Sequence, residues 1–247
     1  MNTIRRELED YRLLLRNIPS LVVALFILSV VLMNFLANKE FISFKYLALD
    51  CGFILSWISF LCMDIICKHF GGKAAVKISI LAMFTNVLVC LMFALLSMSP
   101  GMWGQYYETG SMEVNRALNS TIAGTWYIVL GSSVAMICGA ITNSSVNHGV
   151  SQLLTRGGFR DFAIRSYAST CLGQFVDNFV FAMIVSVHFF GWTWLQVLFC
   201  SITGAVMELL CEVVFSPLGY KVCKNWERDN VGAPYFQYRS DFESEVK

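Results

Sequence analysis

Asp177 lies in the middle of an apolar segment, residues 168–190, which is long enough to cross a bilayer. A carboxylate in hydrocarbon costs at least about 2.5 kcal/mol, so ionisable groups in such segments usually face a binding site or a partner. Gln174, Asn178 and Phe181 lie at helical spacing from Asp177, so all four side chains share one stripe. A carboxylate and two amides beside an aromatic ring suit a planar heterocyclic ligand. A clamp between helices is the alternative interpretation, although helix association needs no carboxylate.

A second group of carboxyls, Glu208 and Glu212, lies one helical turn apart in the apolar segment 194–215. Like charges at this spacing repel each other, and a low dielectric strengthens the repulsion. Either one carboxyl is therefore protonated, or a cation or a hydrogen-bond donor lies between the two. Proton coupling is one interpretation of this pair, and hydrogen bonding of both carboxyls to neighbouring helices is the other.

Asp50, Trp57 and Asp64 are spaced seven residues apart, which places them near one face of a predicted helix over residues 46–67. The two carboxylates then lie about 21 Å apart along the helix axis, near its opposite ends. Asp64 precedes Lys68 by one turn. It therefore either forms an ion pair at the membrane boundary or takes part in gating or coupling.

The apolar segment 122–147 carries a stripe of small and polar residues at intervals of three or four: Ser132, Ser133, Met136, Gly139, Ala140, Asn143 and Asn147. Small residues allow helices to approach closely, and such a stripe also permits a homodimer. The amide of Asn143 offers both donors and acceptors, so it equally suits the wall of a ligand cavity. The sequence leaves both interpretations of this stripe open.

The composition places these segments in an integral membrane protein. Of the 247 residues, 56% are hydrophobic and only 14% are charged, and the mean hydropathy is +0.60. A soluble domain carries about a quarter charged residues. Six apolar runs of roughly 20 residues predict an all-α, polytopic membrane fold with six transmembrane helices. They lie at residues 18–37, 46–67, 74–98, 122–147, 168–190 and 194–215.

Lys and Arg are distributed unevenly between the two ends of these predicted helices. One side holds only Lys39, Lys45 and Arg116, whereas the other side carries the remaining fifteen of the 18 basic residues. The positive-inside bias therefore predicts a multi-pass protein of the plasma (inner) membrane with both termini in the cytoplasm.

The regions outside the six helices divide the chain into three parts. We expect a cytoplasmic N-terminal segment (residues 1–17), a six-helix transmembrane domain (18–220) and a cytoplasmic tail without periodicity (221–247), with disorder near residues 240–247. The apolar residues of the N-terminal segment recur at helical spacing, which predicts an amphipathic surface helix; a solvated start to the first span is the alternative. The longest connection on the other side, residues 100–121, is expected to be a loop.

Several kinds of chemistry lack the motifs they need. Residues 71–73 (GGK) lack the rest of a nucleotide-binding loop, and neither a G-x-S-x-G nor an H-E-x-x-H motif occurs. The nine cysteines form no C-x-x-C pair, and the three histidines share no spacing that would place two on one helix face. We therefore predict no enzyme activity, catalytic residue, cofactor, metal site or nucleic-acid partner. Membrane lipid and a small-molecule substrate, a planar heterocycle, are the expected partners.

Five stretches of the chain are similar to the motifs of a known family: residues 60–64 (FLCMD), 70–75 (FGGKAA), 165–169 (RSYAS), 173–178 (GQFVDN) and 216–220 (SPLGY). In these motifs the chain resembles the vitamin uptake transporter family, whose best-understood members are queuosine precursor transporters. The resemblance extends over the second to sixth predicted helices. Its most specific part leads from Arg165 and Ser169 to Gln174 and Asp177.

The resemblance implies a six-helix membrane importer that salvages precursors of the tRNA nucleoside queuosine. These are 7-deazaguanine bases: 7-cyano-7-deazaguanine, 7-aminomethyl-7-deazaguanine or queuine. The resemblance also implies functional roles for Asp64, Arg165, Ser169, Gln174 and Asp177. A guanine-like edge presents adjacent N–H donors that a carboxylate accepts in pairs, while an aromatic ring stacks on the face of the base.

The chain departs from the family pattern at two places. The family's fourth helix carries a Gln and an acidic residue where this chain has Ala140 and Asn143, and its sixth often has a Lys near Met207, beside which this chain has Glu208. Because these charges differ from those of the family, the identity of the substrate remains open. Two other functions also remain open: a substrate-binding subunit of an ATPase-driven vitamin or nucleobase importer, and a nontransporting membrane assembly component.

Overall fold

The computed structural model describes residues 3–153 and 159–245, and most of this chain is helical. Two short strands, β1 (Glu40–Ser43) and β2 (Ala48–Asp50), form an antiparallel hairpin. The helices are α1 (Thr3–Asn17), α2 (Ser20–Leu36), α3 (Phe53–Phe70), α4 (Gly72–Ser97), α5 (Gly104–Thr109), α6 (Met112–Leu153), α7 (Phe159–Phe181), the π-helical turn η1 (Ala182–Ser186), α8 (Val187–Phe190), α9 (Trp194–Arg228) and α10 (Ala233–Glu245).

The long helices have the length and composition of membrane spans. In the described residues, α3, α4, α6, α9 and the continuous run of α7, η1 and α8 each pass this test alone. Helix α2 becomes a sixth span when it is taken together with α1, from which it is bent by 103°. Large apolar side chains such as Phe84, Leu91 and Leu95 are more than half exposed on α4, as a lipid-facing surface requires. The predicted all-α, polytopic membrane fold is confirmed.

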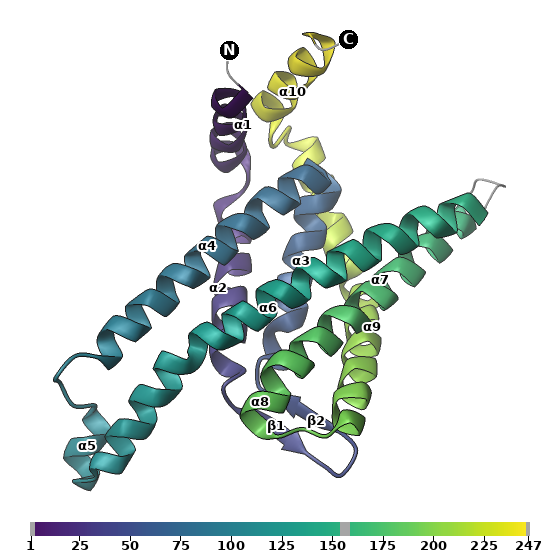
Figure 1. Ribbon diagram of the computed structural model, residues 1–247. Coiled ribbons are helices and arrows are strands. Elements are labelled where there is room, and N and C mark those ends of the chain that lie inside the picture. Colours follow the sequence, from purple (N-terminus) through teal and green to yellow (C-terminus); the bar gives the residue numbers. More distant parts are fainter. Residues whose placement is uncertain (1–2, 154–158, 246–247) are drawn as a thin grey trace.

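The two ends of the molecule carry different elements (Figure 1). Both termini lie at one end with α1 and α10, whereas the hairpin, α5 and α8 lie at the opposite end. Helices α6 and α7 run side by side because small residues meet between them. A Cβ built on Gly139 would lie 3.0 Å from the carbonyl oxygen of Gly173, and one built on Gly173 would lie 2.9 Å from the Cβ of Asn143. The small-residue stripe therefore packs α6 against α7.

The second predicted helix begins later than the sequence indicates. Residues 48–50 form β2, and α3 starts only at Phe53. The carboxylate Oδ1 of Asp50 accepts a hydrogen bond from the Gly52 N–H at 2.8 Å. At this turn a Cβ on Gly52 would lie 2.5 Å from the carbonyl oxygen of Met33, so the chain turns tightly against α2. The prediction that Asp50 shares a helical face with Trp57 is wrong, because Asp50 precedes the helix.

Residues 100–121 are largely helical, which corrects the expected loop. They contain α5, and α6 starts at Met112. Two hydrogen bonds from Trp103 hold this region against α6. Its backbone N–H donates to Asn115 Oδ1 at 2.8 Å, and its indole Nε1–H donates to Asn119 Oδ1 at 2.6 Å. These amides lie on the first turns of α6, where hydropathy alone predicts no helix.

The C-terminal tail is largely helical although its sequence shows no periodicity, and α10 extends to Glu245, where disorder was expected. Helix α9 continues past Pro217 to Arg228, and α10 packs beside α1 (Figure 1). Tyr235 of α10 is fully buried, and the ring of Phe236 stacks on Phe70 of α3 with centroids 5.6 Å apart. Contacts between aromatic rings distant in sequence therefore order the tail.

The hairpin is hydrogen-bonded to the segment that connects α8 to α9 and to the start of α9. The indole Nε1–H of Trp192 donates to Glu40 Oε1 at 2.7 Å, and Gln196 Nε2 donates to the carbonyl oxygen of Phe44 at 3.0 Å. Trp192 itself is buried. The hairpin therefore closes over the end of the molecule at which α8 meets α9.

Candidate functional site

Two cavities lie between α3, α7 and α9, and we name them by the end of the molecule that each one approaches. The hairpin-side cavity has a volume of about 80 Å³, and its lining includes Asp50, Ser132, Asp177, Asn178, Phe181 and Ser186. The terminus-side cavity has a volume of about 470 Å³, and its lining includes Trp57, Asp64, Lys68, Thr170, Gln174 and Phe215. Phe60 and Glu208 line both cavities, so the cavities meet at these two side chains.

The polar stripe predicted on α7 lies along this junction. Asp177, Asn178 and Phe181 line the hairpin-side cavity, and Gln174, one turn nearer the start of α7, lines the terminus-side cavity. The four side chains thus come together along one side of α7. Gly139 of α6 lies behind Asp177, because a Cβ built there would be 3.0 Å from the Asp177 Cβ. The contact with α6 fixes the position of the carboxylate.

Glu208 is the carboxyl group that both cavities share, and only 7% of its surface is exposed. Asn178 Nδ2 donates a long hydrogen bond of 3.5 Å to Glu208 Oε1. The other oxygen, Oε2, is buried and has no hydrogen-bond partner in the described part of the chain. An unpaired buried polar atom costs about 1–3 kcal/mol, and a charged one costs more. This oxygen therefore retains the capacity to accept a further hydrogen bond.

Gly204 of α9 allows Asn178 to approach Glu208. A Cβ built on Gly204 would lie 2.7 Å from Asn178 Nδ2 and 2.9 Å from its Cγ, which is closer than real Cβ contacts come. The absence of a side chain at this position therefore leaves room for the amide that hydrogen-bonds the shared carboxyl group.

Ser186 is a second unpaired group in the hairpin-side cavity. Its Oγ is fully buried and, within the described residues, has no hydrogen-bond partner. Ser186 follows Asp177 by nine residues, which in a regular α-helix would place it on roughly the opposite face. The π-helical turn η1 rotates it toward the cavity, and such turns frequently occur at functional sites. A search at α-helical spacing therefore misses Ser186.

Not every predicted site residue lines these two cavities. Asn143 is exposed on α6 beside Gly173 and lines neither of them, which favours the packing interpretation of the α6 stripe. Ser169 is buried on α7 and also lies outside both linings. Arg165 and Glu212 lie on α7 and α9, but their side chains fall outside the described part of the structure.

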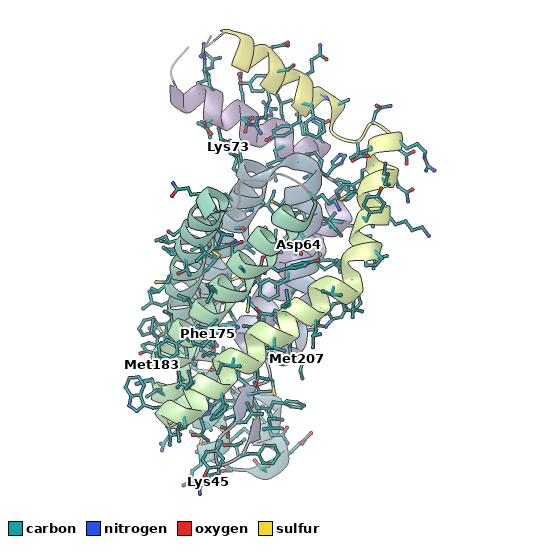
Figure 2. The ribbon with its side chains drawn as sticks, turned by 90° about the vertical axis from the view of Figure 1, so that its right-hand side faces the viewer. Lys45, Asp64, Lys73, Phe175, Met183 and Met207 are labelled. Atoms are coloured by element: carbon teal, nitrogen blue, oxygen red, sulfur yellow. The ribbon has the colours of Figure 1, made fainter. Side chains whose placement is uncertain are left out.

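The terminus-side cavity contains an aromatic pair, of which the sequence singled out Trp57 but not Phe215. The rings of Trp57 and Phe215 are stacked, with centroids 4.6 Å apart and an interplanar angle of 16°. Asp64 lines the same cavity together with Lys68. Figure 2 shows Asp64 nearer to Lys73, at the end that carries the termini, than to Lys45 at the hairpin end.

Asp50 reaches the hairpin-side cavity from β2, outside the membrane-spanning helices. Burial raises the pKa of its carboxyl group to about 6, although hydrogen bonds from the backbone of Gly52 and Phe53 favour the charged form. Asp50, Asp177 and Glu208 together give this cavity three carboxyl groups, and its described lining contains no Lys, Arg or His.

Apolar helices of spanning length that enclose polar cavities define the protein as a multi-pass helical membrane protein. The chain belongs to the vitamin uptake transporter family, whose model matches residues 50–222. This match begins at the end of the hairpin and covers α3 to most of α9, so it includes every residue that lines the terminus-side cavity. No curated protein and no solved structure matches the chain.

Proposed function

We propose that this transporter imports queuosine precursors, the 7-deazaguanine bases, across the plasma (inner) membrane, with both termini in the cytoplasm. The orientation rests on the basic residues, which concentrate in α1, around the turn between α3 and α4, and in the last part of α9. Lys73 lies at the terminus end, and Lys45 is among the few basic residues of the hairpin end (Figure 2). Positive charge favours the cytoplasmic side, so import runs from the hairpin side to the terminus side.

The proposal rests on Oε2 of Glu208, which lies at the junction of the two cavities and has no hydrogen-bond partner among the described residues. A 7-deazaguanine base presents adjacent N–H donors, which a carboxylate accepts in pairs. Asp177 supplies a second carboxyl group, and Gln174 and Asn178 supply amide donors and acceptors. The ring of Phe181 offers a surface on which the base stacks, as in pockets that bind an extruded base.

The sizes of the two cavities fit an importer in the state that is open toward the cytoplasm. The terminus-side cavity, at about 470 Å³, falls within the range of about 300–1,000 Å³ that small-molecule sites occupy, whereas the hairpin-side cavity, at about 80 Å³, is far smaller. In this state a base would leave toward the cytoplasm, and the hairpin side would have to widen to admit another. The hydrogen bonds of Trp192 and Gln196 to the hairpin are among the contacts that keep that side closed.

The charge of the hairpin-side cavity favours particular members of this substrate class. Among the described residues, its lining carries three carboxyl groups and no basic side chain. An ammonium group attached to the base would therefore meet opposite charge, and charge-assisted hydrogen bonds are roughly twice as strong as neutral ones. 7-Aminomethyl-7-deazaguanine and queuine carry a protonated amine, whereas 7-cyano-7-deazaguanine is neutral. We accordingly propose that the two cationic bases are preferred.

A binding panel with the purified protein tests the proposal. We expect 7-aminomethyl-7-deazaguanine to raise the thermal unfolding midpoint by mass action and to bind roughly tenfold more tightly than 7-cyano-7-deazaguanine. Adenine and unrelated vitamins serve as controls that should leave the midpoint unchanged. No response to any 7-deazaguanine base would contradict the assignment of substrate. Tighter binding of the cyano base would contradict only the preference for a cation.

Replacing Gly204 with Ala is expected to weaken binding of the same base roughly tenfold, because the added methyl group displaces the Asn178 amide from Glu208. Isothermal titration measures the change. Gly124→Ala in α6 is the matched control, since it lies outside the lining of both cavities and its Cβ would meet nothing closer than the ring of Phe189 at 3.8 Å. Equal weakening in both variants would argue against a specific role for Asn178.

A further inference from the structure

The hairpin-side cavity carries polar side chains from its junction with the terminus-side cavity toward the hairpin. Ser186 follows Asn178 by eight residues, and Cys200 precedes Glu208 by eight residues. At 1.5 Å per residue, Ser186 and Cys200 therefore lie about 12 Å nearer to the end at which α8 meets α9. Asp50 of β2 lines the cavity at the same end. Polar groups are thus spaced along the cavity from Glu208 to the hairpin end of the molecule.

This cavity has the components of a path for protons. Its volume of about 80 Å³ has room for two or three water molecules at about 30 Å³ each. Within the described residues the buried Oγ of Ser186 has no hydrogen-bond partner, and a hydroxyl group both donates and accepts hydrogen bonds. Burial raises the pKa of the Asp50 carboxyl group to about 6, so this group gains and loses a proton close to neutral pH. Carboxyl groups inside membrane proteins commonly belong to proton relays.

On the hairpin side, Glu208 faces acidic and neutral groups. The other titratable side chains of the described lining are Asp50 on β2, Asp177 on α7 and Cys200 on α9. The residues that α2, α3 and α6 contribute to this lining are all uncharged. An ionised Glu208 would therefore meet like charge and no described cation, in surroundings where a low dielectric strengthens the repulsion.

On the terminus side, one cation shares a described lining with Glu208. The other titratable side chains of that lining are Asp64, Lys68, Cys211 and Tyr220. Lys68 Nζ lies 4.8 Å from the centre of the Tyr220 ring, and Tyr220 follows Glu208 by 12 residues, or about 18 Å along α9. Lys68 is therefore too distant to pair with Glu208. The side chain of Glu212, one turn from Glu208, falls outside the described part of the structure.

We propose that the ammonium group of a cationic base and a proton occupy Glu208 in turn, so that the protein exchanges the base for a proton; this exchange rests on the function proposed above. Both occupants use the buried Oε2, which has no hydrogen-bond partner among the described residues. When the hairpin side is open, the base binds the ionised carboxylate, and the displaced proton leaves past Ser186 and Asp50.

The empty site returns with a proton in place of the base. After the base has left toward the cytoplasm, a proton from the cytoplasm neutralises Glu208. Because an ionised, unpaired carboxylate is costly inside the membrane, the site changes sides only with one of its two occupants bound. Each direction then carries one positive charge, so the exchange is electrically neutral.

Isothermal titration of the purified full-length protein, in phosphate and in Tris at the same near-neutral pH, counts the protons released on binding, because the two buffers differ in their enthalpy of ionisation. We expect 7-aminomethyl-7-deazaguanine to release about one proton and the neutral 7-cyano-7-deazaguanine to release none. The affinity for the aminomethyl base should fall up to about tenfold for each unit by which the pH is lowered, because the proton then competes more strongly for the carboxylate.

Two variants identify the group that releases the proton. Glu208→Gln keeps an oxygen that accepts from Asn178 but cannot titrate, so binding to this variant should release no proton. Glu227→Gln makes the same change on an exposed carboxylate of α9 and should release as many protons as the wild type. If Glu208→Gln does not bind the base, the comparison of the two bases in the wild type still decides the question.

Transport is followed in liposomes that contain the protein and enclose a pH-sensitive dye, with the membrane potential held at zero. Entry of the aminomethyl base should make the lumen more alkaline, because protons leave as the base enters. Acidification of the lumen, or uptake at constant lumen pH, would overturn the exchange. Binding of the aminomethyl base without proton release, or equal release with the cyano base, would also overturn it while the proposed function stands. Failure to bind either base would overturn both.

Discussion

Replacing Asp177 with Asn is expected to abolish the uptake of 7-aminomethyl-7-deazaguanine while the protein accumulates normally in the membrane. Asn keeps the Cβ that packs against Gly139 and the overall shape of the side chain. It removes the charge that would accept paired N–H donors and attract the ammonium group. Hydrogen bonds to charged groups contribute about 1.5–3 kcal/mol each, so the loss of affinity should be on the order of 100-fold. Uptake of labelled base by cells that express the variant measures the effect.

Asp229→Asn is the matched control for this experiment. It makes the same chemical change on an exposed residue just after α9, where Asp229 contacts only Arg228 in the described ion pairs. Uptake by this control should equal that of the wild type. Wild-type uptake by the Asp177→Asn variant, at equal protein levels, would remove Asp177 from the substrate site.

Replacing Glu208 with Leu is expected to have opposite effects on stability and transport. The substitution removes a buried carboxyl group whose Oε2 has no hydrogen-bond partner in the part of the chain that the structure describes, and Leu suits the apolar interior of a membrane protein. The free energy of unfolding should therefore rise by about 1–2 kcal/mol. Uptake should be lost, because the group at which the two cavities meet would no longer accept a hydrogen bond. Thermal unfolding in detergent and an uptake assay on the same variant measure the two effects.

The two effects of Glu208→Leu distinguish a substrate site from a structural clamp. If Glu208 serves only to join α9 to α7 through Asn178, its removal should lower stability, as the hypothesis of a nontransporting assembly component requires. A less stable variant with normal uptake of the protein that remains would contradict the proposed role of Glu208.

Helical spacing was sufficient to predict the central part of the candidate site. Gln174, Asp177, Asn178 and Phe181 lie on one unbroken stretch of α7, so their common stripe follows from the geometry of a regular helix. Glu208 was likewise identified as a carboxyl group inside a span. Most of the six spans were also predictable, because their apolar runs have no other explanation in a chain of this composition.

Features that depend on tertiary contacts were not predictable from the sequence. The hairpin takes the place of the expected start of the second helix. It is held by hydrogen bonds to Trp192 and Gln196, which lie about 150 residues away in the sequence, so local spacing does not reveal it. Ser186 reaches the cavity only through a π-helical turn. Phe60 is one aromatic residue among many in an apolar helix until the structure places it at the junction of two cavities.

The most direct test of the account is the uptake of labelled 7-aminomethyl-7-deazaguanine into liposomes that contain this chain alone. We predict time-dependent entry that exceeds the rate into protein-free liposomes and falls to that background rate with Asp177→Asn. Entry by the isolated chain would also exclude the need for an ATPase subunit. Background entry by a wild-type protein that is correctly inserted and folded would contradict the claim that the polar groups of α7 and α9 form a transport site.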